Sequence, residues 1–183
     1  MDYPFKYYTD RGDFQNDYHE LFYSLLGKRV LRVFGVWDLP DNSWFEETPI
    51  IIEFENGMLS VVTKSFHSIS VLWNVLFPSE KPTWLGEAPE LDWSEDLIWK
   101  EYISFDDTVI EKAEILHSST SIIGLVFSTN QGMYGIVDNG DITVCMSEES
   151  LIKYLFDVRE DFSLSNVQYY MPEGEQIELG QIV

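Results

Sequence analysis

The chain has 183 residues, 45% of them hydrophobic and 15% aromatic, and its 32 acidic residues against 11 basic ones give a net charge of −21. The aromatic content excludes a disordered acidic tail, because such tails carry too few large apolar residues to form a core. The length fits one domain, which we expect to span residues 1–183. The negative charge should repel phosphate backbones and anionic lipid headgroups, so neither direct nucleic-acid binding nor membrane binding is expected.

The cysteine content and the N-terminus favour a cytoplasmic location. Cys145 is the single cysteine and has no partner for an intrachain disulfide. The first ten residues lack the basic and apolar regions of a secretory signal. No apolar run approaches the roughly 18 residues that a membrane span needs.

The first predicted element is a helix over residues 14–26. Its apolar residues recur at helical spacing and form one stripe, which predicts a buried face: Phe14, Tyr18, Leu21, Phe22, Leu25 and Leu26. Asp13 is the predicted N-cap, and Gly27 suits the stop.

Two sets of β-type segments follow, each rich in Val, Ile and aromatic residues. The first set comprises residues 30–37, 50–55, 58–63 and 69–73, and the second comprises 109–117, 122–128, 133–137 and 142–146. Asn56-Gly57 and Asn139-Gly140 each predict a two-residue hairpin turn, of type I′ at Asn56-Gly57, where both central residues need positive φ. Because the connections are too short for crossover helices, the sheet should be mainly antiparallel.

A second helix is predicted over residues 148–157. Ser147 is its N-cap, Glu148 and Glu149 lie in its first turn, and its buried face should hold Leu151, Ile152, Leu155 and Phe156. The tail from 166 to 183 alternates weakly and should end as an edge strand or an ordered arm. The fold class is therefore α+β.

The two β sets resemble each other, which suggests two duplicated four-strand units over residues 28–73 and 109–146. Gly57–Val62 matches Gly132–Val137, and Ile69–Val71 then corresponds to Ile142–Val144. The alternative is that any two meanders share hairpin glycines and alternating Val and Ile, and two copies are too few to establish a repeat.

No motif for catalysis, cofactor binding or metal binding is present. The chain lacks a nucleophile elbow, a phosphate-binding loop, a dinucleotide fingerprint, a zinc-type helix motif and a C-x-x-C pair. Cys145 lies in an apolar strand, and His19, His67 and His117 are far apart in sequence. We therefore expect no enzyme activity and no cofactor, although paired carboxylates are hard to exclude in so acidic a chain.

The segment that joins the units, residues 74–108, combines acidic and aromatic residues. Rigid aromatic side chains provide contact area at binding hot spots, and carboxylates steer a basic partner. The predicted partner-binding residues are Asp92, Trp93, Glu95, Asp96 and Trp99. The alternative is that these tryptophans belong to the core and that the acids merely solvate a loop.

An N-terminal helix followed by short antiparallel strands with hairpins of the type Phe54-Glu55-Asn56-Gly57 resembles many small acidic immunity proteins of bacterial polymorphic-toxin systems. The resemblance spans about residues 14–157 and carries no diagnostic motif. It implies a cytoplasmic inhibitor that binds a basic toxin, for example a nuclease. The rival hypotheses are a DNA-mimic inhibitor, a non-catalytic adaptor subunit and a carboxylate-dependent enzyme. The sequence leaves the oligomeric state open.

Overall fold

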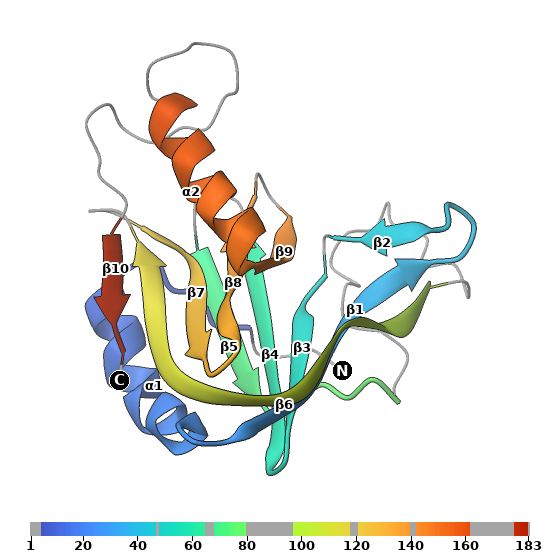
Figure 1. Cartoon of the computed structure of the whole chain (residues 1–183), viewed down its shortest axis with the longest axis horizontal. Helices are drawn as coiled ribbons and strands as arrows, with labels where there is room; N and C mark the ends of the chain where they lie inside the picture. Colours follow the sequence, from blue (N-terminus) through green and yellow to red (C-terminus); the bar gives the residue numbers. More distant parts are fainter. Residues whose placement is uncertain are drawn as a thin grey trace.

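The computed structural model describes residues 5–46, 48–64, 68–79, 97–117, 121–139, 142–161 and 178–182. Within these ranges every strand pairing between the named strands is antiparallel. The prediction of an antiparallel sheet with an N-terminal helix and a second helix towards the C-terminus is confirmed, and the sheet dominates (Figure 1). The elements are α1 (Arg11–Leu25), β1 (Arg29–Asp38), β2 (Ser43–Phe45), β3 (Ile50–Phe54), β4 (Gly57–Lys64), β5 (Ser68–Trp73), β6 (Leu97–His117), β7 (Ile122–Thr129), β8 (Gly132–Asp138), β9 (Thr143–Ser147), α2 (Glu148–Asp161) and β10 (Glu178–Gln181).

The sheet is organised around the pairing of β1 with β6. The strand order is β5-β4-β3-β1-β6-β7-β8-β9, with β2 beside β1 and β10 beside β6. A register shift lies between Val30 and Arg32 in the β1–β3 pairing, and another lies between Ile110 and Lys112 in the β6–β7 pairing. The two predicted units therefore share both a strand order and the position of a register shift, while their common origin stays a prediction.

The registers correct one detail of the predicted correspondence between the units. Gly57 and Gly132 each begin a strand directly after a two-residue turn, so β4 matches β8. Val61 pairs with Val71 in the first unit, and the equivalent Ile136 pairs with Cys145 in the second. Val71 therefore corresponds to Cys145 and not to Val144.

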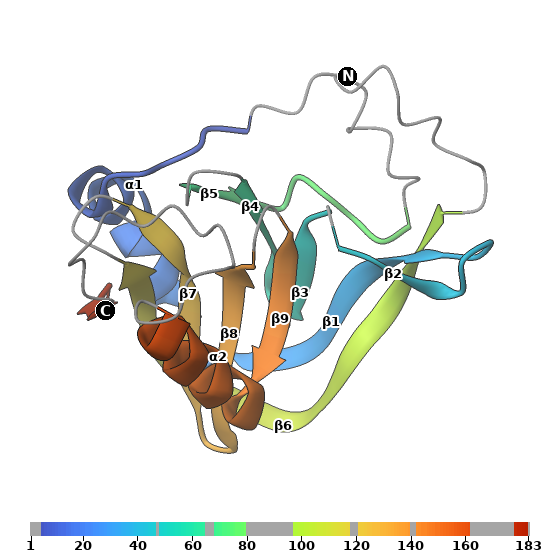
Figure 2. The same ribbon diagram turned by 90° about the horizontal axis from the view of Figure 1, so that it is seen from above.

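The sheet consists of two four-strand meanders, β1-β3-β4-β5 and β6-β7-β8-β9. It curls so that the two meanders face each other around the main core (Figure 2). The Thr63 N–H of β4 donates to Thr143 Oγ1 of β9 at 3.0 Å, which joins the two halves directly. A second cluster lies between the β7–β9 face and α2, and a third covers the β1–β3–β5 face. The main core includes Phe14, Phe22, Leu25, Val33, Ile52, Leu59, Ile69, Ile115, Leu125 and Ile136.

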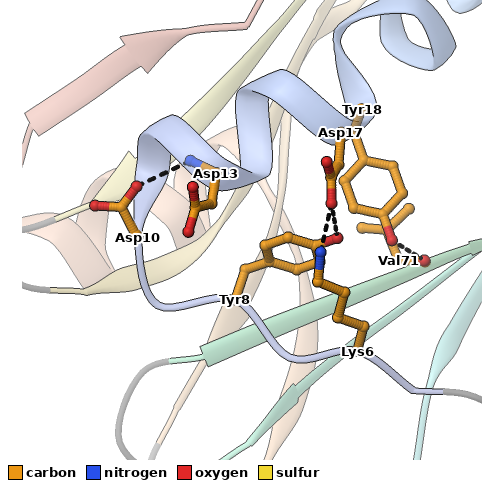
Figure 3. A network of polar contacts seen from close by, with 7 residues as sticks. All are labelled: Lys6, Tyr8, Asp10, Asp13, Asp17, Tyr18 and Val71. Atoms are coloured by element: carbon orange, nitrogen blue, oxygen red, sulfur yellow. Dashed lines mark hydrogen bonds and ion pairs between the residues drawn. The ribbon is translucent and has the colours of Figure 1, made fainter.

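Helix α1 packs against strands of both meanders. The Phe22 ring contacts the Phe127 ring of β7 with centroids 6.2 Å apart. The Tyr18 hydroxyl donates to the carbonyl oxygen of Val71 on β5 at 2.8 Å (Figure 3). The stripe predicted from helical spacing thus buries the helix against both sides of the curled sheet.

The segment before α1 fixes the helix to β5. Tyr8 and Ile69 exchange two backbone hydrogen bonds, of 2.8 and 3.0 Å. On α1, Asp17 accepts a hydrogen bond from the Tyr8 hydroxyl and one from Lys6 Nζ at 2.5 Å (Figure 3). The hydrogen bond from Lys6, followed by the one from Tyr8, lowers the pKa of the Asp17 carboxyl below its usual range.

The helix α1 begins three residues earlier than predicted. Asp10 is its N-cap, and its side chain accepts from the Asp13 N–H at 2.9 Å. Asp13, the predicted cap, lies in the first turn because Asp10 takes the capping role. The predicted stop is confirmed, since Gly27 adopts φ 73° just beyond the helix.

Helix α2 extends beyond the predicted end, to Asp161. Leu151 is buried, but Ile152 is 53% exposed, so its predicted place on the buried face is wrong. Helix α2 packs on the sheet through the side that holds Leu151, and Ile152 points towards the solvent. The side chains of Leu155 and Phe156 lie outside the described part of the chain.

The hairpin predicted at Asn56-Gly57 forms, but its turn lies one residue earlier. Phe54 pairs with Gly57, so Glu55 and Asn56 are the loop residues. Neither loop residue has a positive φ, whereas Gly57 has φ 158°, and the predicted type I′ turn is therefore wrong. A Cβ at Gly57 would meet the side chain of Asn74, so the glycine leaves room for the segment that follows β5.

The second hairpin connection is longer than predicted. Asp138 pairs with Thr143, and the Asn139 N–H donates to the Ile142 carbonyl at 3.0 Å. Four residues, 139–142, therefore join β8 to β9, and Gly140 is one of two that lie outside the described residues. An Asn-Gly pair favours chain reversal, but the strand pairing on either side sets the loop length.

The joining segment and the tail contribute strands. β6 begins at Leu97, well before the predicted start at 109, and its first half pairs with β1. β10 pairs with residues 114–117 of β6, which confirms a strand in the tail. Long-range pairing with β1 gives regular structure to residues that have no clear β pattern of their own.

Candidate functional site

The predicted partner-binding surface lies mostly outside the described residues. Asp92, Trp93, Glu95 and Asp96 precede the start of β6 and stay a prediction. Trp99 lies on β6 opposite Val36 of β1. Its side chain is partly buried against the third cluster, so the structure places it at the edge of a core face.

The chain just after these residues belongs to a projecting arm. We define the arm as β2 together with residues 35–38 of β1 and 97–102 of β6. Figures 1 and 2 show these strand ends standing away from the two meanders. Trp37 is central in the arm, since it pairs with Trp44 of β2 on one side and with Ile98 of β6 on the other.

Three aromatic side chains form a continuous wall on one face of the arm. The aromatic wall consists of Trp37, Trp44 and Tyr102, and all three side chains are partly buried. The rings of Trp37 and Trp44 meet edge to face, with centroids 4.9 Å apart. Trp44 and Tyr102 lie 4.4 Å apart at an interplanar angle of 42°. These separations match those of favourable aromatic pairs, so the rings hold one another in place.

Gly35 lets the wall lie against the strand. A Cβ at this position would lie 3.0 Å from Tyr102 Cδ2 and 3.3 Å from Trp44 Cε3, closer than ordinary contacts. A glycine inside a strand is usually unfavourable, and it often marks a close approach by another group. Here the groups that approach are the rings of the wall.

A bulge brings Tyr102 into the wall. Val33 pairs with Ile103, whereas the next residue, Phe34, pairs with Glu101, so Tyr102 is an extra residue on β6. Bulges bend a strand and redirect a side chain. Without this insertion the aromatic ring would have a different position relative to β1.

The inner end of the wall is shielded from water and is near negative charge. Burial is the main cause that raises the pKa of the Tyr102 phenol above its usual value, and the carboxylate of Glu46 adds to it at neutral pH, where the Cys145 thiol is uncharged. Tyr102 therefore stays protonated and can donate a hydrogen bond at neutral pH. The wall runs from this enclosed end to the solvent at Trp37.

The outer end of the wall already holds a cation. The ammonium nitrogen of Lys100 lies 3.8 Å from the centroid of the Trp37 ring. Ile98 beside Trp37 is 40% exposed, and Leu39 just beyond β1 is 49% exposed. This end of the arm therefore presents aromatic and aliphatic surface together with a single paired lysine.

The described residues provide little for nucleophilic or metal chemistry. Cys145 is buried, and its desolvation raises the pKa of the thiol to about 12, which keeps it protonated at neutral pH. His117 Nε2 lies 2.9 Å from an Arg11 guanidinium nitrogen. In the described ranges no group of three or more His, Cys, Asp or Glu residues could hold a metal ion. Over the same ranges, no helix is long and apolar enough to cross a membrane.

The sequence alone does not predict the wall as a site. Tyr102 lies in the joining segment but is not among the predicted partner-binding residues, and the sequence predicts no role for Trp37 or Trp44. The signal available was the pair of tryptophans on either side of the turn at residues 39–42, together with Gly35 inside a predicted strand. Their meeting with Tyr102 depends on the β1–β6 register, which local sequence does not specify.

Comparisons with protein-family models, with curated proteins and with solved structures find no significant match to this chain.

Proposed function

We propose that this chain is an acidic, non-catalytic binding protein that inhibits a basic protein, in the manner of an immunity protein that neutralises a cognate toxin. The aromatic wall carries the proposal. Its three rings are packed before any partner arrives, so little side-chain entropy remains to be lost on binding. Preordered aromatic residues at the centre of an interface typically provide much of the binding energy.

The charge of the chain supports a basic partner. A net charge of −21 accelerates encounter with a cationic surface and repels another acidic one. Near the wall, Asp41 is exposed in the turn between β1 and β2, and Glu46 follows β2. The wall would supply binding energy, while the carboxylates would steer association.

The test is co-purification from the native host, followed by affinity measurements with the partner that is identified. Trp37→Ala should weaken binding by about 2 kcal/mol or more, mainly through faster dissociation. The control is Tyr23→Ala on α1, because Tyr23 is an aromatic residue that is 63% exposed and distant from the arm. Affinity should also fall as salt is raised.

Two outcomes would contradict the proposal. One is a partner that is acidic or binds without salt dependence. The other is equal affinity of the Trp37→Ala and Tyr23→Ala variants, which would move the interface away from the wall. Substrate turnover by the purified protein would refute its non-catalytic part.

A further inference from the structure

The cation on the aromatic wall is unusually close to its ring. Lys100 Nζ lies 3.8 Å from the Trp37 centroid, whereas Lys6 lies 4.4 Å from the Tyr8 ring and Lys64 lies 5.4 Å from the Tyr7 ring. Tryptophan is also the aromatic side chain that attracts cations most strongly. The outer face of Trp37 is therefore the best-formed cation site among these three lysine contacts.

The geometry fixes this site in advance. The edge-to-face contact with Trp44 sets the plane of the Trp37 ring, and Trp44 is braced in turn by Tyr102 over Gly35. Lys100 reaches the ring diagonally, because Lys100 pairs with Gly35 and Trp37 pairs with Ile98. The ring is rigid, but the lysine that covers it is exposed and has a flexible stem.

We propose that the outer face of Trp37 binds an arginine or lysine side chain of the partner, and that Lys100 is an internal stand-in which the partner displaces. This inference rests on the proposed function and names the chemical group recognised at the wall. A guanidinium stacks on an aromatic face better than an ammonium and is less strongly hydrated, so arginine is the preferred occupant. The displaced Lys100 returns to water at little cost because it is already exposed.

The surroundings favour a cation over an apolar side chain. An incoming cation meets a chain with a large excess of acids, including the exposed Asp41 in the turn between β1 and β2. In the free protein Lys100 competes for the same ring face. Removing Lys100 should therefore strengthen binding of a cationic ligand by more than the loss of one positive charge explains.

The test uses fluorescently labelled hexa-arginine peptide, titrated by anisotropy into the full chain and its variants. Lys100→Met keeps a similar side-chain length without the charge, and Lys153→Met removes an exposed charge on α2 as the matched control. Lys100→Met should bind the peptide about two- to fivefold more tightly than Lys153→Met does, the range expected for one exposed cation–π contact.

A double-mutant cycle assigns the effect to the ring. With Trp37→Leu in place, the advantage of Lys100→Met over Lys153→Met should disappear. Trp37→Phe, which keeps an aromatic ring and is a milder change to the fold, should retain part of the advantage. Circular dichroism of each variant checks that the arm is intact.

Each result is decisive. If Lys100→Met and Lys153→Met raise the affinity for hexa-arginine equally, Lys100 is not a stand-in for a partner side chain. The proposal that this acidic protein binds a basic partner would then still hold. An advantage that persists in Trp37→Leu would also overturn the stand-in role of Lys100, because the ring would then not be the site. If no variant binds hexa-arginine at low salt, both this inference and the proposed basic partner are wrong.

Discussion

Replacing Trp44 by alanine should loosen the arm, because Trp44 is the middle ring of the aromatic wall. It contacts Trp37 at 4.9 Å and Tyr102 at 4.4 Å between centroids. Each such pair contributes about 0.5–1.5 kcal/mol beyond burial of its area, so the loss of both should cost about 1–3 kcal/mol. The loss falls on the arm, since β2 pairs with β1 alone within the described residues.

Amide hydrogen exchange measures this loss where it occurs. Residues 36–38 of β1 should exchange about 5- to 160-fold faster in Trp44→Ala, the factor that corresponds to 1–3 kcal/mol. Urea unfolding should show a smaller change if the arm opens before the rest of the sheet. Tyr23→Ala is the control and should leave the exchange of β1 unchanged, because that ring is 63% exposed. Unchanged exchange in Trp44→Ala would refute the idea that the three rings support one another.

Three further predictions concern the core. Gly124→Ala should destabilise the fold by about 1–3 kcal/mol in urea unfolding, because its Cβ would collide with the backbone carbonyl of Ile136; an unchanged midpoint would contradict the β7–β8 packing. Cys145 should resist thiol reagents at pH 8 until the protein unfolds, and rapid labelling of the folded protein would refute its burial. The free energy of unfolding should fall as the pH rises from about 9 towards the raised thiol pKa of about 12, because only the thiol of the unfolded chain ionises in this range. Tyr18→Phe should cost about 0.5–1.5 kcal/mol by leaving the Val71 carbonyl without this donor, and thermal unfolding that matches the parent would show the bond to be worth nothing.

Local patterns in the sequence predicted most of the elements. The stripe from Phe14 to Leu25 predicted α1, and alternation of Val and Ile predicted strands whose bounds differ from the observed ones by at most one residue, apart from the start of β6. Gly27 was correctly predicted to end α1, because a left-handed residue after a helix is nearly always glycine or asparagine. Periodicity and propensity act over a few neighbours, and these features depend on few neighbours.

Features that depend on distant partners were missed. The first half of β6 is a strand because β1 pairs with it, and the bulge at Tyr102 exists only relative to that pairing. The turn falls at Glu55-Asn56 because Phe54 pairs with Gly57, and Gly57 lies against Asn74 from beyond β5. The aromatic wall combines both effects, so its residues could be noticed in the sequence but not assembled.

The central pairing of β1 with β6 has a consequence for the order of folding. Within each meander, neighbouring strands are joined by short turns, so their contacts close small loops. The β1–β6 pairing instead joins residues such as Arg29 and Val109, with a whole meander between them. Closing so long a loop costs more entropy and slows folding. We expect the two meanders to form early and the β1–β6 pairing to form last. A nascent chain would then acquire the Trp37 surface only when folding is complete.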